Sequence, residues 1–462
     1  MHVQLPHIAF AGLAVASVLT ACADQVNTPT VAAPTSSAVA DRSANNVQCA
    51  PDNAGLTLPP GFCALVVADL TLNGSPAAAR HLVITPSGDI FVAINAPGNR
   101  QPAFGIIGLR DRDGDGRADE QSQFSPNLGG SGLALEENRL YFGANDRVLR
   151  YHLAAGRLTP EGDAEVVVSG LPATGDHISK DVALASGNRL FVNLGSATNS
   201  CQVVNRVAQS PGIFPCPELP IRAGVWLFDA RGNNQTEASG EHYATGYRNL
   251  VSITVNPRNN EVYAVQQGRD MLFENWPQFF TAQQDSALPA EEMVRIARGS
   301  NNGWPYCFFD ADFEHKKLLA PEYGGNGHIV VGPQGIDCSS FNQPLATFGA
   351  HWSPETMLFY TGAQLPSHYR NGAFVAFHGG FDRAPFPNEG FQVDFVPFGE
   401  NGLPSGASET FADGFAGPGT PLPAAAAHRP VGLAVGPDGS LYVSDDRGGR
   451  IYRIVFRGGN DH

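Results

Sequence analysis

The chain has 462 residues and a formal net charge of −15, and it contains 52 glycines and 35 prolines. This acidic balance argues against a nucleic-acid-binding protein, because no basic stretch offsets it. So much glycine and proline, with few long periodic helices, indicates many turns and short strands. The length suits one large domain or two ordinary ones.

The N-terminus has the pattern of an export signal. Residues 8–21 form an apolar run that is short for a membrane span but typical of the hydrophobic region of a signal peptide. The run ends in Leu19-Thr20-Ala21-Cys22, which resembles a bacterial lipobox. We therefore expect a signal peptide over residues 1–21, a lipid on Cys22 and a location in the cell envelope, in the periplasm or at the outer membrane. An ordinary cleaved signal with an incidental cysteine is the alternative.

The segment after Cys22 lacks the large apolar residues that a core needs. Residues 22–46 are rich in Ala, Ser, Thr, Val and Pro, a composition typical of a flexible tether. We expect the folded part over residues 47–456 and a short tail over residues 457–462.

Six further cysteines fall in neighbouring pairs along the chain. An even number of cysteines in an exported chain indicates disulfides, although six cysteines allow fifteen pairings. We favour the local pairs, because each closes a short loop: Cys49 with Cys63, Cys201 with Cys216, and Cys307 with Cys338.

A turn containing Gly, Asn or Asp, followed by an apolar strand, occurs six times. The instances are residues 86–94, 137–143, 186–194, 257–265, 371–377 and 437–444. A repeated strand–turn–strand pattern is typical of propeller blades, although β-sandwiches have the same local pattern. We predict an all-β fold, a six-bladed β-propeller with long inter-strand loops. The spacing between motifs exceeds a simple blade repeat most in residues 270–370. We expect these extra residues to form loops that carry the functional site.

An acidic loop has the spacing of a calcium-binding loop. Asp111, Asp113 and Asp115 stand at its first, third and fifth positions, with Gly at the sixth and Asp119 at the ninth. The twelfth position is Ser122, where a complete loop has glutamate, so Glu120 would have to bend in. We predict a structural calcium clip here; the alternative is a solvated acidic turn.

Several longer segments are more specific than the blade motif. They are Thr245-Gly-Tyr-Arg-Asn-Leu250, Ala264-Val-Gln-Gln-Gly-Arg-Asp270, Gly303-Trp-Pro-Tyr306, His351-Trp-Ser-Pro354, His378-Gly-Gly-Phe-Asp-Arg383 and Arg429-Pro-Val-Gly-Leu-Ala-Val435. In this order they resemble the soluble pyrroloquinoline-quinone (PQQ) glucose dehydrogenases, and more closely the sorbosone-dehydrogenase-like branch. The resemblance covers nearly all of residues 50–456. It implies PQQ- and Ca²⁺-dependent oxidation of a sugar or polyol, with electrons passed to an unknown acceptor.

The resemblance assigns the catalytic base to His177, with Asp176 beside it. In that family a histidine takes the substrate hydroxyl proton while hydride passes to the quinone. Such a base needs a pKa near that of imidazole, about 6.5. A carboxylate in the same turn would favour the charged imidazolium.

The resemblance also assigns groups to the cofactor, whose three carboxylates suit the planar fork of arginine. Arg248 and Asn249 would lie near the quinone oxygens, where Arg248 would stabilise developing charge. Arg429 matches an arginine that contacts a cofactor carboxylate, and Arg383 is a looser match. A threonine of the cofactor pocket corresponds to His351.

Two calcium sites follow from the same resemblance. The backbone carbonyls of Gly268 and Arg269 would hold the calcium on the cofactor, since backbone oxygens are ordinary calcium ligands. Glu292 matches a carboxylate of a separate structural calcium site.

Two other functions fit the expected fold. Six-bladed propellers also include calcium-dependent lactonases and esterases, and the fold alone does not separate these from dehydrogenases. Those hydrolases bind metal through carboxylates and asparagine, whereas the motif cations here favour an anionic cofactor. The third possibility is a non-catalytic carbohydrate-binding lipoprotein.

Overall fold

The computed structural model describes residues 47–72, 74–96 and 100–458. The predicted signal peptide, the lipidation site Cys22, the whole predicted tether and residues 459–462 of the tail lie outside these residues. In the part that is described, no helix is long and apolar enough to cross a membrane.

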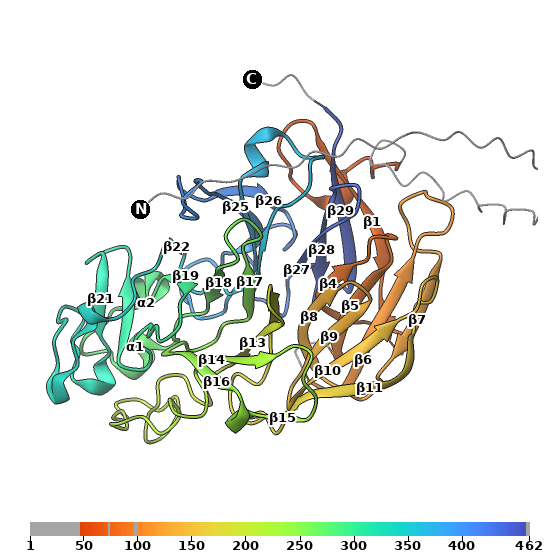
Figure 1. Cartoon of the computed structure of the whole chain (residues 1–462). Helices are drawn as coiled ribbons and strands as arrows, with labels where there is room; N and C mark the ends of the chain where they lie inside the picture. The colour runs from red at the N-terminus through yellow and green to blue at the C-terminus, as the bar shows by residue number, and fades with distance from the viewer. Residues whose placement is uncertain (1–46, 73, 97–99, 459–462) are drawn as a thin grey trace, which may run out of the picture. The chain divides into compact units, whose positions relative to one another are not determined.

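Six antiparallel sheets form the six predicted blades (Figure 1). The first five, in chain order, are β4–β7 (Ala78–Ile84, Ile90–Ala96, Arg100–Arg110, Glu120–Phe124), β8–β11 (Gly130–Glu136, Arg139–Ala144, Arg147–Leu153, Pro160–Ser169), β12–β13–β14–β16 (Val182–Ala185, Arg189–Leu194, Gly224–Asp229, Glu241–Thr245), β17–β18–β19–β22 (Ser252–Val255, Val262–Gln266, Glu291–Ile296, Ala346–Phe348) and β23–β26 (Pro354–Phe359, Gly372–His378, Phe391–Pro397, Glu409–Ala412). A short strand, β15 (Gln235–Thr236), adds in parallel to β11.

The sixth blade joins the two ends of the folded region. It consists of β27 (Pro430–Val435), β28 (Leu441–Asp445) and β29 (Arg450–Phe456), with β1 (Phe62–Asp69) as its outermost strand. The two end strands pair antiparallel, from Phe62 opposite Phe456 to Asp69 opposite Arg450, and Figure 1 shows them side by side. This pairing closes the ring of blades.

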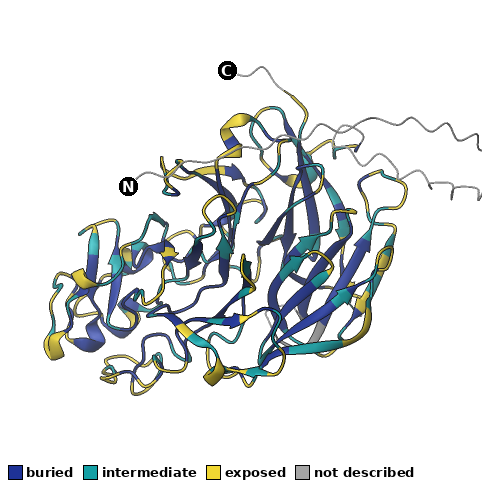
Figure 2. Ribbon diagram, viewed as in Figure 1, coloured by how far each residue is buried: buried dark blue, intermediate teal, exposed yellow. Residues whose placement is uncertain are grey.

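Side-chain alternation along the strands builds the core. In β5, Phe91 and Ala93 pack in one hydrophobic cluster with the second blade, whereas Val92 and Ile94 pack in another with the sixth. Successive strand residues point to opposite faces of a sheet, so each blade presents an apolar face to each neighbour. Six such clusters lie between consecutive blades. Figure 2 shows the strands mostly buried and the loops mostly exposed.

The topology gathers particular loops on one face. All six sequence motifs are the hairpins between the innermost and second strands of the blades. The innermost strands β4, β8, β12, β17, β23 and β27 contact one another in a ring. The hairpin turns therefore lie at one end of this ring. The loops that enter the innermost strands and leave the second strands meet at the other end, which we call the entry face.

Two of the long loops belong to the entry face, and a third, between β19 and β22, packs against one of them. Residues 195–223 connect β13 to β14, and residues 267–290 connect β18 to β19 and carry α1 (Leu272–Asn275) and α2 (Ala282–Ala287). Residues 297–345 carry a hairpin of β20 (Cys307–Asp310) and β21 (Lys316–Leu319). A second small hairpin, β2 (Thr71–Leu72) with β3 (Ser75–Pro76), follows β1.

The three local disulfides are confirmed: Cys49–Cys63, Cys201–Cys216 and Cys307–Cys338. The second closes part of the 195–223 loop, and the third ties the β20–β21 hairpin to residue 338. Two of the three therefore brace these long loops.

Candidate functional site

His177 lies in the loop that enters β12, with its ring held through one nitrogen. Nδ1 lies 3.1 Å from the backbone oxygen of Ser196 and 2.9 Å from its Oγ. That hydroxyl donates to the backbone oxygen of Thr198 at 2.7 Å. Its proton is thus engaged elsewhere, and Nδ1 carries the hydrogen that it shares with Ser196. No described residue hydrogen-bonds to Nε2, which leaves this nitrogen able to accept a proton.

The surroundings of His177 favour the neutral ring. Burial, followed by the nearby charge of Arg248, holds the pKa of His177 well below its usual value. A neutral imidazole at ambient pH is the form that a general base requires.

Asp176 has a different role from the expected one. Its carboxylate accepts from Nε of Arg206 at 2.9 Å and from Nδ2 of Asn205 at 3.2 Å. The expected stabilisation of an imidazolium by Asp176 is therefore not seen: the carboxylate is paired with Arg206, and the pKa of His177 is lowered.

Arg248 is buried in the loop that enters β17 and is linked to His177 through Ser196. The backbone N–H of Ser196 donates to the Arg248 carbonyl at 2.8 Å. Nη2 of Arg248 donates to Asn199 Oδ1 at 3.0 Å and to Asp270 Oδ2 at 2.7 Å. Nη1 has no hydrogen-bond partner among the described residues. One edge of the guanidinium is thus fixed, and the other is available to a ligand.

Arg206 was not identified from the sequence. Its guanidinium pairs with Asp176 on one side and with Asp270 on the other, at 2.9 Å each. Asp270 also pairs with Arg248, and these cations hold its pKa below the usual value although burial opposes ionisation. Arg206 therefore joins the loop of the proposed base to the loop after β18.

Asn249 leads from Arg248 towards the propeller axis. Its Nδ2 donates to Gln267 Oε1 at 2.8 Å, and Nε2 of Gln267 donates to Glu355 Oε1 at 2.9 Å. Glu355 in turn accepts from Arg80 at 2.5 Å. One polar chain thus connects residues from three blades.

Charged residues that the sequence analysis missed cluster at the inner end of this chain. Arg80 contacts Asp446 at 2.8 Å as well as Glu355, and His378 lies 3.1 Å from Glu355. Burial opposes ionisation of both carboxylates. Arg80 and His378 nevertheless lower the pKa of Glu355, and Arg429, His378 and Arg80 lower the pKa of Asp446. Arg429 joins them through the His378 carbonyl, at 2.7 Å. The only sequence signal was a charged residue at the edge of an apolar blade strand.

The backbone carbonyls of Gly268 and Arg269 are free of donors from the described part of the protein, as metal ligands must be. Neither oxygen accepts a hydrogen bond from a described residue. Glu291 fixes this turn by accepting from the Gly268 N–H at 2.7 Å, and burial raises the pKa of Glu291 to about 7. The Arg269 side chain points elsewhere, into a buried ion pair with Glu322.

Asp270, the next residue, belongs to a group of possible metal ligands that come from distant parts of the chain. Asp270, His351 and Asp382 offer ligand atoms that all lie within 4.8 Å of one another, and Glu274, Asp285 and Asp382 form a second such group. Burial and repulsion by Asp382 raise the pKa of Asp285 to about 8. Negative charge is in excess here, a condition that a bound cation would relieve.

His351, expected at the cofactor, lies within this group. Its Nε2 is 2.8 Å from the Asp285 carbonyl, and its Nδ1 is 3.9 Å from Asp270. Burial opposes its charge, but Asp270 and Asp382 raise the pKa of His351 to about 9.

The expectation for Glu292 needs correction. Lys317 Nζ lies 3.2 Å from Glu292 Oε2, and both side chains are almost fully buried. Nζ also donates to the Asn302 carbonyl at 2.5 Å. An ammonium from β21 thus provides the positive charge that the resemblance assigned to a structural calcium.

Arg383 also differs from its expected role at the cofactor. It donates to the carbonyls of Pro387 at 2.8 Å and Ser286 at 2.6 Å, and it pairs with Glu389 at 3.1 Å. Its guanidinium joins neighbouring loops rather than facing His177 and Arg248.

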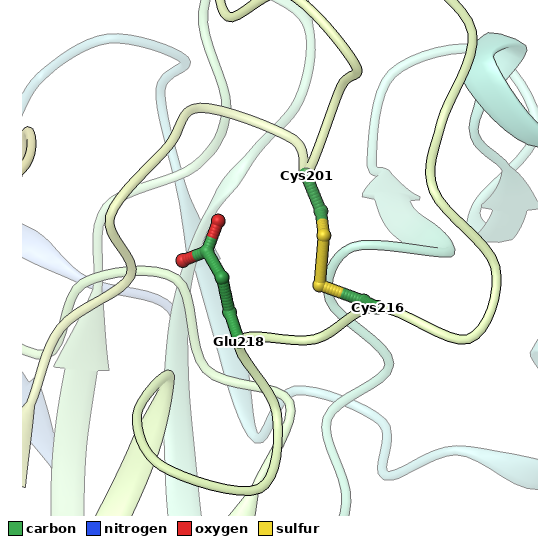
Figure 3. A group of neighbouring side chains, drawn as sticks. All are labelled: Cys201, Cys216 and Glu218. Carbon is green, nitrogen blue, oxygen red and sulfur yellow. A yellow bond between two sulfur atoms is a disulfide. The ribbon is translucent and has the colours of Figure 1, made fainter.

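Figure 3 shows Glu218 beside the Cys201–Cys216 disulfide. Glu218 accepts from the Ala197 N–H and from Thr198 Oγ1. Both sulfurs are bonded to each other, so these three residues do not form a metal site. They fix the loop that carries Ser196.

The predicted calcium clip has part of the required geometry. Ligand oxygens of Asp111, Asp113 and Asp115 lie within 4.8 Å of one another. Asp119 instead accepts from the Arg112 N–H at 2.8 Å, and Glu120 pairs with Arg112 at 2.5 Å. The loop therefore has three gathered carboxylates, and Glu120 does not bend in to complete them.

Comparison with curated proteins identifies an uncharacterised protein of Borreliella burgdorferi, 26% identical over 272 residues. The match covers 59% of this chain and 58% of that protein. It therefore leaves activity, substrates and partners open.

Solved structures share the fold. The calcium structure of a Trichoderma reesei member of Carbohydrate-Active Enzymes Family AA12 has a TM-score of 0.69 at 20% identity, over 89% of this chain and 99% of that one. The holo PQQ domain of a Coprinopsis cinerea pyranose dehydrogenase has a TM-score of 0.67 at 19% identity, over 87% and 97%. The apo soluble aldose sugar dehydrogenase of Escherichia coli has a TM-score of 0.53 at 15% identity, over 86% and 100%.

A family model, described as TrAA12-like, matches residues 58–456. This range contains all six blades and every site residue described above. The chain belongs to the TrAA12-like family.

Proposed function

We propose that this chain is a PQQ- and Ca²⁺-dependent oxidoreductase that oxidises a sugar or polyol hydroxyl or aldehyde at the cell envelope. The observation that carries the proposal is the pairing of a neutral His177, with Nε2 unengaged, and a buried Arg248 with one edge unengaged. A proton acceptor and a fixed cation are linked through Ser196, as dehydrogenation of an alcohol requires.

The donor set fits PQQ. An anionic cofactor with three carboxylates needs several cations. Arg248 and Arg429 supply two from different blades, whereas Arg80 is paired with Glu355 and Asp446. When bound, PQQ supplies an ortho-quinone that takes up two electrons. Arg248 would hold positive charge at the quinone edge, and the Asn249 side-chain amide would orient the quinone.

The site also fits a calcium ion. The Gly268 and Arg269 carbonyls lack donors, and Asp270 follows them immediately. Calcium takes six to eight oxygen ligands, which carbonyls and carboxylates supply together. The excess of negative charge around Asp382 supports a cation in this position.

His177 performs the proton chemistry in this proposal. Nδ1–H remains on Ser196, so the substrate hydroxyl proton goes to Nε2, and the ring becomes an imidazolium. Nearby Asp270 favours that charge, whereas Arg248 opposes it. The proton can then leave to solvent, because His177 is only half-buried.

The related structures support the substrate class, since they include a pyranose dehydrogenase and an aldose sugar dehydrogenase. The sorbosone-like branch, the export signal and the lipid on Cys22 remain parts of the proposal. So does the Asp111 clip, which would brace β6–β7 against β1, because Ala118 N–H donates to the Val67 carbonyl at 2.9 Å.

The test is a panel assay on the purified chain with PQQ, CaCl₂ and a redox dye. Aldoses, polyols, simple alcohols and lactones are compared. The proposal predicts dye reduction by sugars or polyols that needs both additions. Lactone hydrolysis without PQQ binding would favour a hydrolase, and absence of both turnover and PQQ binding would favour a carbohydrate-binding protein.

A further inference from the structure

Exposed apolar side chains concentrate on the loop that walls the candidate site. Among the described residues, twelve large apolar side chains are exposed, and half of them lie within residues 203–221. Val203 is 62% exposed, Val204 53% and Val207 46%. Singly exposed apolar residues are ordinary on a surface, but a contiguous group marks an interaction site.

This group lies at the site rather than at a distance from it. Val203, Val204 and Val207 flank Arg206, which pairs with both Asp176 and Asp270. The same loop supplies Ser196 to His177 and Asn199 to Arg248.

A second loop carries an exposed aromatic ring next in sequence to a residue of the site. Phe381 is 59% exposed and precedes Asp382, whose carboxylate lies within 4.8 Å of a ligand atom of Asp270. Exposed apolar side chains on two loops therefore stand next in sequence to Arg206 and Asp382, which both lie close to Asp270. We call Val203, Val204, Val207 and Phe381 the rim patch.

The rim patch is held in place by covalent and polar contacts. The Cys201–Cys216 disulfide closes the loop, and Glu218 clamps it at Ala197 and Thr198 (Figure 3). The Val203 N–H donates to the Pro211 carbonyl at 2.9 Å. A braced loop that keeps apolar groups in water is suited to docking, because their desolvation on contact is favourable.

The proposed function indicates what docks there. Each turnover would leave two electrons in the site, and they must pass to an acceptor. All six described cysteines are in disulfides, so none can hold an iron–sulfur cluster. The acceptor must therefore approach the site from outside.

Charge narrows the kind of acceptor. The chain has a net charge of −15. The exposed Asp176 pairs with Arg206 of the patch loop, and the exposed Glu274 has a ligand atom within 4.8 Å of Asp382. Such a surface attracts a cationic partner and is repelled by an anionic membrane.

We infer that the rim patch docks an electropositive one-electron carrier protein, such as a basic c-type cytochrome, over the mouth of the site. This inference rests on the proposed function. Two equivalents of oxidised carrier take one electron each, and two protons pass to solvent. A small interface with an apolar centre and a charged margin suits such a transient redox encounter.

The test compares the full chain with a Val203→Ser/Val204→Ser/Phe381→Ser variant. Leu422→Ser is the control, because Leu422 is also 59% exposed but lies outside the patch. Binding of oxidised basic cytochrome c to the cofactor-free proteins is measured by surface plasmon resonance. Reduction of the cytochrome and of a small dye is then measured with PQQ and CaCl₂.

We expect the triple variant to bind the cytochrome and to reduce it about tenfold less well, a loss of the size that hot-spot truncation gives. Its dye reduction should equal that of the Leu422→Ser control, and added salt should weaken cytochrome binding. Equal cytochrome binding by variant and control would overturn the inference. So would binding of anionic phosphatidylglycerol vesicles in place of the cytochrome. Absence of dye reduction in every protein would instead count against the proposed function, and the cofactor-free binding result would still decide the inference.

Discussion

Nδ1 of His177 lies 2.9 Å from Oγ of Ser196, and this contact decides which ring nitrogen can react. The Ser196 hydroxyl is committed to Thr198, so the histidine donates and Nε2 is left as the acceptor. Ser196 also reaches the Arg248 carbonyl through its backbone N–H. The candidate base and the candidate electrophilic cation are therefore positioned by one residue.

The first prediction concerns the pH dependence of activity. The pKa of His177 is lowered by burial and by Arg248, so the ring stays neutral to a lower pH than an ordinary histidine. The acidic limb of kcat/KM should accordingly lie below about pH 6.5. His177→Ala should lower kcat by about a hundred- to ten-thousand-fold, in a steady-state dye assay. An unchanged kcat in His177→Ala would rule out His177 as the base.

The second prediction concerns Arg206. Its positive charge helps to lower the pKa of His177, so Arg206→Gln should raise that pKa and move the acidic limb upwards, while Arg206→Lys should restore most of the effect. Titration of the His177 ring by NMR in the cofactor-free chain measures this directly.

The matched control is Arg450→Gln, which breaks an ion pair with Asp69 in the sixth blade. It should leave the titration of His177 unchanged. If Arg206→Gln and Arg450→Gln gave the same His177 titration, Arg206 would have only a structural role.

The third prediction follows from the buried pair of Glu292 and Lys317. Lys317→Met would leave a buried carboxylate without its cation, and such a change costs about 3–5 kcal/mol. The double variant Glu292→Gln/Lys317→Met should regain a large part of the loss. Urea unfolding measures both variants. A calcium-dependent rescue of Lys317→Met would mean that a metal can take the place of the ammonium.

The fourth prediction separates the stabilising and functional roles of the disulfides. Cys201–Cys216 and Cys49–Cys63 have sequence separations of 15 and 14, and closing a loop of this length is worth about 3 kcal/mol. Replacing either pair by serine should lower the free energy of unfolding by a similar amount. Only the Cys201/Cys216 variant should also lose kcat/KM, because its loop carries Ser196 and Arg206. Equal loss of activity in both variants would contradict this division.

The fold could be predicted because its signal is local. Each blade motif spans fewer than ten consecutive residues, and the three disulfides join cysteines that are neighbours along the chain. His177, Arg248 and Asn249 were found for a related reason: each lies in or next to a recognisable segment at the entrance of an innermost strand.

The rest of the site depends on contacts between distant blades. Arg80, Glu355 and Asp446 come from the first, fifth and sixth blades, and nothing in any one segment indicates their pairing. Glu292 was assigned to calcium because its partner, Lys317, comes from the β20–β21 hairpin. Arg383 looked like a cofactor ligand until the carbonyls around it were placed.

The central claim is that this site binds PQQ through Arg248 and Arg429 and a calcium ion. Its most direct test is an equilibrium titration of the purified chain with PQQ, followed by the change in cofactor absorbance, with CaCl₂ or with EDTA. The same titration is made on Arg248→Met. We predict saturable binding of one PQQ per chain in calcium, and marked weakening both in EDTA and in Arg248→Met. No saturable binding in calcium, or equal affinity in the wild-type chain and Arg248→Met, would contradict the account.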